Sequence, residues 1–80
     1  MAGYRLPIEI EPLEEGGYLA RSAVLPGFLV QADTIEDLVE LAPGVARSLL
    51  QAMKAKGVPL PKELRALRPP LRVEILVPAP

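Results

Sequence analysis

Few residue types in this 80-residue chain could do chemistry. The sequence contains no histidine and no cysteine, so it lacks the commonest general base, the thiol nucleophile and the nitrogen and sulfur ligands of zinc. The remaining candidates are carboxylates in the first half of the chain, namely Glu9, Glu11, Glu14, Glu15 and Asp33. Carboxylate oxygens that converge from several elements can hold the two divalent ions of a metal-dependent nuclease.

The spacing of these carboxylates favours a solvated rim over a metal site. Glu9 and Glu11 fall on the polar face of an alternating segment, and Glu14 and Glu15 fall in a turn. The serines have no evident base beside them. We therefore expect no catalytic residue, no metal site and no bound cofactor. The alternative left open is a residual nuclease that would use Glu9, Glu11 or Asp33 with Mg²⁺ or Mn²⁺.

Glycine and proline occur at two places where a binding loop could be suspected, Gly16-Gly17 and Pro26-Gly27. A phosphate cradle needs a helix N-terminus directly after the glycines, and no helical pattern follows Gly17. Tight turns require these residue types for their backbone angles. We therefore predict a structural role for both pairs.

The charges are balanced in number but uneven along the chain. Nine Lys and Arg residues oppose ten Asp and Glu residues, for a net charge of -1, so the chain as a whole has no pull toward a phosphate backbone. The second half has a basic bias, carried by Arg47, Lys54, Lys56, Lys62, Arg65, Arg68 and Arg72. This polarity could steer a partner or align subunits, although ordinary solvated charge is the simpler explanation.

The size of the chain predicts one domain, residues 1–80, with a marginal core. Half of the residues are hydrophobic and only three are aromatic, so the core must be mainly aliphatic. Neither a disulfide nor a zinc site can reinforce it, which leaves self-association. No apolar run approaches the roughly 20 residues that cross a bilayer, so we expect no membrane contact and a cytoplasmic location. Ten prolines and no asparagine or cysteine suggest a thermophilic source.

The first half of the chain reads as an antiparallel meander. Residues 4–11 alternate between apolar and polar side chains, as in a half-buried strand. Pro7 has no N–H to donate, so we expect this strand to lie at a sheet edge or beside a break in pairing. Two turns separate it from a strand at residues 18–24 and a short strand at residues 28–31.

A long helix follows, beginning at Thr34 and stopping at Gly57. Its apolar residues recur at steps of three and four and should pack on the sheet. Pro43 lies inside this pattern, so we predict a kink or a break there. Pro61 then begins a short helical turn, and the alternating residues 71–77 form a fourth strand. The prediction is an α+β fold: a three-stranded meander, one long helix packed on it, the short turn and the fourth strand.

Three motifs along the chain resemble those of the N-terminal domain of HicB-like antitoxins. They are Gly16-Gly17-Tyr18-Leu19-Ala20, Leu25-Pro26-Gly27-Phe28, and Asp33-Thr34 leading into Ile35-Glu36-Asp37-Leu38. The resemblance covers roughly residues 4–61. It implies a partial RNase H-like fold that lacks the nuclease's full acidic site and tends to self-associate. In complete antitoxins such a domain neutralises a small HicA toxin that cleaves mRNA.

The chain also departs from the family pattern. Ala32 stands where the family usually has glycine, and Asp37 and Leu38 replace glutamate and alanine at the helix start. Complete antitoxins carry a C-terminal helix-turn-helix or ribbon-helix-helix, whereas residues 62–80 are predicted to hold a short helical turn and one strand. We therefore expect no DNA binding by this chain alone.

The resulting hypothesis is a non-enzymatic HicB-like antitoxin that forms a homo-oligomer and binds a small basic HicA-like toxin. The strand predicted at residues 71–77 is a candidate for edge pairing between copies. Two alternatives stay open: the metal-dependent nuclease described above, and an orphan structural or regulatory domain with no toxin.

Overall fold

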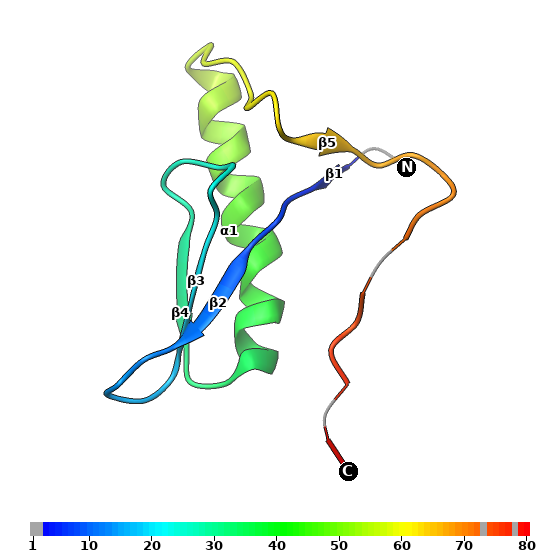
Figure 1. Cartoon of the computed structure of the whole chain (residues 1–80). Helices are drawn as coiled ribbons and strands as arrows, with labels where there is room; N and C mark the ends of the chain where they lie inside the picture. Colours follow the sequence, from blue (N-terminus) through cyan, green and yellow to red (C-terminus); the bar gives the residue numbers. More distant parts are fainter. Residues whose placement is uncertain (1–2, 73, 78) are drawn as a thin grey trace.

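The computed structural model of the protein describes residues 3–72, 74–77 and 79–80. Its elements confirm the predicted α+β class, with a three-stranded antiparallel meander, one long helix and a separate pair of short strands (Figure 1). In chain order they are β1 (Tyr4–Arg5), β2 (Glu9–Pro12), β3 (Tyr18–Arg21), β4 (Leu29–Ala32), α1 (Ile35–Ala55) and β5 (Arg65–Ala66). The partial RNase H-like assignment stays a prediction.

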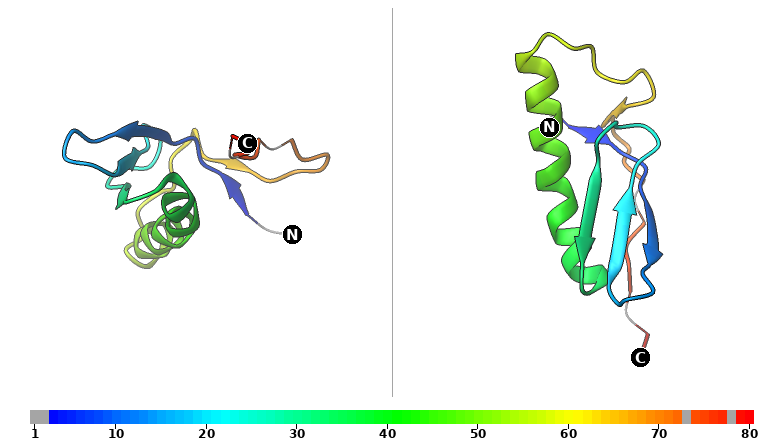
Figure 2. Two further views of the ribbon diagram at one scale, coloured as in Figure 1. Left: turned by 90° about the horizontal axis from the view of Figure 1, so that it is seen from below. Right: turned by 90° about the vertical axis from the view of Figure 1, so that its left-hand side faces the viewer.

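The meander has the strand order β2-β3-β4, and its register lines up the core side chains. Ile10 lies opposite Ala20, which in turn lies opposite Val30. Because side chains alternate between the two faces of a sheet, this row points to one side, where α1 covers the sheet (Figure 2). Leu38 and Ala42 are the buried residues of the helix and complete the contact. The meander and helix therefore form two layers around one aliphatic core.

The first predicted strand is divided at Pro7, as the missing N–H suggested. β1 ends at Arg5 and β2 begins at Glu9, so residues 6–8 belong to neither strand. β2 pairs with β3, whereas β1 pairs with β5 in a separate two-stranded sheet. The prediction of a break in pairing beside Pro7 is therefore confirmed.

Both ends of α1 are capped by the residues that the sequence indicated. The hydroxyl oxygen of Thr34 accepts a hydrogen bond from the Asp37 amide at 3.1 Å. Past the other end, Gly57 has a φ of +71° and donates to the Lys54 carbonyl, and the next amide donates to the Met53 carbonyl at 2.9 Å. This pair of bonds is a Schellman motif, which explains why the stop residue is glycine. No helix in the described part of the chain is long and apolar enough to cross a membrane.

Pro43 does not split the helix. α1 runs unbroken for 21 residues through it, so the predicted alternative of two helices is wrong. Proline removes a single hydrogen bond, the one to the Val39 carbonyl, at a solvent-facing position. Apolar residues on both sides, including Leu38 and Leu49, belong to or pack against the core and keep the two halves in one line.

The strand predicted at residues 71–77 is replaced by β5, which lies earlier in the chain. β5 pairs with β1 through Tyr4 opposite Ala66 and Arg5 opposite Arg65. No strand forms at residues 71–72 or 74–77, and Val73 lies outside the described residues. A strand needs a partner to satisfy its backbone groups, and in this chain residues 65–66 take the place beside β1. The predicted helical turn at Pro61 is a single turn in which Leu64 donates to the Pro61 carbonyl at 3.1 Å.

The two glycine-containing turns have the structural role that the sequence predicted. Gly17 has a φ of +82°, and a Cβ at this position would lie 2.9 Å from the Ala32 carbonyl oxygen. In the second turn Gly27 has a φ of +83°, and the Phe28 amide donates to the Leu25 carbonyl at 3.2 Å. Both ends of this turn, Leu25 and Phe28, are buried. The turns therefore set the backbone of the meander and place two core residues.

The close approach of Gly17 to the Ala32 carbonyl oxygen leads to a direct prediction. The Gly17→Ala variant should lower the free energy of unfolding by about 1–3 kcal/mol, because the new methyl meets the Ala32 carbonyl and the positive φ is unfavourable. Urea unfolding followed by circular dichroism measures this. Gly44→Ala is the matched control: it lies inside α1 with no described heavy atom within 4 Å of the added Cβ, and it should add about 0.5–1 kcal/mol. Equal stability of the two variants would contradict the argument.

Candidate functional site

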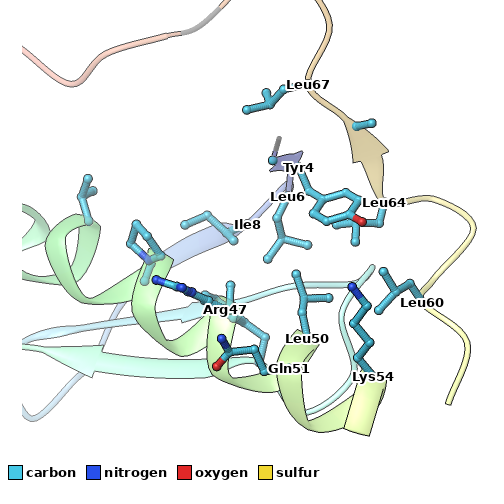
Figure 3. Close-up of a pocket in the computed structure, with 17 residues that line it drawn as sticks. Tyr4, Leu6, Ile8, Arg47, Leu50, Gln51, Lys54, Leu60, Leu64 and Leu67 are labelled. Atoms are coloured by element: carbon cyan, nitrogen blue, oxygen red, sulfur yellow. The ribbon is translucent and has the colours of Figure 1, made fainter. Parts of the chain in front are cut away.

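An open groove of about 990 Å³ lies on one side of the described chain (Figure 3). It lies between the segment around β1, one side of α1 and residues 60–67, and its lining is mostly aliphatic. The apolar lining residues include Leu6, Ile8, Phe28, Val39, Ala42, Pro43, Ala46, Leu50, Leu60, Leu64 and Leu67. A surface of this kind can bind apolar side chains but offers no acid–base chemistry.

Polar side chains from the helix border this groove on one side. Arg47, Gln51 and Lys54 follow one another at steps of four and three residues, which places them on one face of α1 (Figure 3). Tyr4 lines the groove from β1 and is about half exposed. The groove therefore combines an apolar floor with a cationic and amide rim, an arrangement suited to a polypeptide segment.

A single serine positions the wall of the groove next to the core. The Ser22 hydroxyl donates to the Pro7 carbonyl at 2.9 Å and accepts from the amides of Val24 and Leu25 at 3.1 and 3.2 Å. It joins the break in the first strand to the turn that buries Leu25. The sequence did not single out Ser22, although a serine just before a Leu-Pro-Gly turn is a known signal for this local bonding.

The carboxylates weighed as metal ligands are not brought together. Glu9 and Glu11 lie on β2, whereas Asp33 follows β4, and β3 separates those two strands. Glu11 forms an exposed ion pair with Arg21, which contributes at most about 1 kcal/mol. Among the described residues, no three or more carboxylates are grouped so as to hold a metal ion.

The uneven distribution of charge along the sequence gives the folded molecule an acidic end and a basic end. The β2–β3 turn with Glu14 and Glu15 and the acidic start of α1 lie toward one end, and the basic end of α1 lies at the other (Figure 1). Beside the helix start is an open hollow of about 420 Å³. It is lined by Gln31, Ala32, Asp33, Asp37, Glu40 and Leu41. Leu41 is 52% exposed, so the hollow offers carboxylates next to an accessible apolar side chain.

Comparison with known proteins tests the family resemblance. No protein-family model matches the chain. Antitoxin HicB 1 of Photorhabdus laumondii subsp. laumondii is 45% identical to it over 38 residues, which are 48% of this chain. This similarity supports the HicB-like resemblance. The matched residues span 24% of the Photorhabdus protein, so the similarity concerns about a quarter of that antitoxin.

Some motif residues also line the concave surfaces: Phe28 lines the groove, and Asp33 and Asp37 line the hollow. Gly17, Gly27 and Thr34 fix turns and a helix start, as described above. The rim formed by Arg47 and Lys54 and the exposed Leu41 stand outside those motifs. Helical periodicity could have placed Arg47 and Lys54 on one face, but it could not show that a groove lies beside them.

The three hydrogen bonds of Ser22 can be tested by removing its hydroxyl. Ser22→Ala leaves the Pro7 carbonyl and two amides without this partner in a half-buried site, so the free energy of unfolding should fall by about 1–3 kcal/mol. Ser48→Ala, at an exposed position of α1, is the control and should change stability by no more than about 0.5 kcal/mol. Chemical denaturation of both variants gives the comparison. If Ser22→Ala unfolds at the wild-type midpoint, Ser22 does not hold the groove wall.

Proposed function

We propose that this HicB-like chain is a non-enzymatic antitoxin, a single domain of residues 1–80 that self-associates and binds a small basic HicA-like toxin in the cytoplasm. The observation that carries the proposal is the 38-residue match to an antitoxin at 45% identity. Glu9 and Glu11 lie on β2 and Asp33 follows β4, with β3 between those two strands, which argues against hydrolysis by this chain.

The acidic hollow supports a basic partner. Asp33, Asp37 and Glu40 line it together with the exposed Leu41. Lys and Arg side chains combine a cationic head with an aliphatic stem, so they complement both parts of such a surface. Complementary charge across an interface also speeds encounter and excludes wrong partners. We therefore place the toxin contact at the end of the molecule where β4 leads into α1.

Purification of the tagged chain from its native host tests the proposal. We expect a small basic protein to co-purify in a fixed molar ratio. That protein should cleave mRNA on its own and lose this activity when the chain is added back. Recovery of the chain without any partner would favour an orphan domain. Metal-dependent RNA cleavage by the isolated chain, lost in Glu11→Ala, would establish the nuclease alternative instead.

The location of the contact gives a second prediction. A variant with Asp33→Asn, Asp37→Asn and Glu40→Gln should bind the co-purified toxin at least about tenfold more weakly, because three attractive charges are lost. A variant with Glu14→Gln, Glu15→Gln and Glu63→Gln has the same change in net charge and should bind nearly as well as wild type. Binding is measured by calorimetry at two salt concentrations. Equal weakening in both variants would show that net charge alone, and not the hollow, attracts the toxin.

A further inference from the structure

The chain after β5 exposes an unusual amount of apolar surface. Leu71, Ile75, Leu76 and Val77 are 47, 78, 64 and 75% exposed. Single exposed aliphatic residues are ordinary, but four within seven residues form a patch that normally has a partner. Residues 71, 75 and 77 share one face of an extended chain, whereas Arg72, Glu74 and Leu76 share the other. The segment 71–77, called the tail below, has the pattern of a half-buried strand without a sheet.

The same chain has an unpaired strand edge that could accept such a strand. β2 is an edge of the meander, so one side of its backbone has no strand partner among the described residues. The groove opens beside Leu6 and Ile8, on the continuation of that edge, and its floor runs along α1. Val39 on this floor is 43% exposed. A strand laid along this edge would bury apolar side chains in the groove and pair its backbone with β2.

The tail of each chain lies apart from its own groove. In the pairing of β1 with β5, Arg65 lies opposite Arg5 and Ala66 opposite Tyr4. The next bond, from the Leu67 amide to the Gly3 carbonyl at 2.9 Å, continues this direction past the start of β1. The chain therefore leaves β5 moving away from Leu6 and β2, and the tail stands apart from the meander (Figure 1). While β1 and β5 stay paired, the exposed tail is accessible to another molecule.

We propose that two copies of this chain exchange their tails, each tail adding as a strand to the β2 edge of the other copy. Leu71, Ile75 and Val77 then enter the groove of the second copy, and both exchanges are equivalent under a two-fold axis. Arg72 lies on the opposite face of the tail and joins the outer face of β2, where Glu9 and Glu11 supply the complementary charge. This inference rests on the self-association proposed above and specifies its surface.

The other edge of the meander is a poor acceptor for the tail. The hollow next to β4 is lined by Asp33, Asp37 and Glu40, whose carboxylates would lose water if aliphatic residues covered them. Leu29 is exposed on β4, which makes it a suitable control position. The choice between the two edges therefore depends on the surroundings of each: the groove at Leu6 and Ile8, just before β2, is apolar, and the hollow beside β4 is acidic.

Molar mass in solution, measured by light scattering, tests the exchange. Wild type should have twice the 8.6 kDa mass of the chain. The tail variant Ile75→Asp/Val77→Asp and the groove variant Val39→Asp should both have half the wild-type mass. All three changed residues are exposed in the single chain, so circular dichroism should show an unchanged helix content. The control Leu29→Asp should keep the wild-type mass.

The remaining outcomes separate this inference from the self-association on which it rests. A wild-type monomer at about 1 mM protein would overturn both. A tail or groove variant that keeps the wild-type mass would overturn the tail exchange and leave self-association through another surface. Loss of the dimer in Leu29→Asp would move the interface to the β4 edge and equally overturn the exchange. Co-purification of a toxin is a separate measurement that none of these outcomes decides.

Discussion

The packing of α1 on the meander is the contact on which the other features of this protein depend. Among the described residues, six apolar side chains are buried: Ala20, Leu25, Phe28, Val30, Leu38 and Ala42. Full burial of one such large side chain is worth only about 1.5–3 kcal/mol, so a core of this size leaves little excess over the entropy of ordering the chain. The caps, turns and strand registers therefore contribute a substantial share of the stability.

The small core explains why the family motifs are made of turn residues. Gly17 and Gly27 adopt positive φ values, and Leu25 and Phe28 end the second turn inside the core. Ser22 connects that turn to the break at Pro7. Residues of this kind decide whether the meander closes under the helix.

Two surfaces of different character result from the arrangement. The groove between the segment around β1, α1 and residues 60–67 is apolar with a cationic rim, and the hollow beside β4 is acidic. The groove continues the edge of the meander formed by β2, and the hollow lies beside the opposite edge, so the two surfaces are separate.

The sequence by itself determined the local structure. Strand alternation, the turn residues, and the Thr34 and Gly57 signals predicted the meander and both ends of α1, because each depends on neighbouring residues and backbone angles alone. Tertiary structure decided the features that need distant partners. Core packing on both sides kept the helix continuous through Pro43, and β1 paired with residues 65–66 instead of 71–77. Periodicity shows which side chains share a face, but only the folded chain shows which faces remain uncovered. The groove and the hollow are both uncovered faces, so the sequence alone could not locate them.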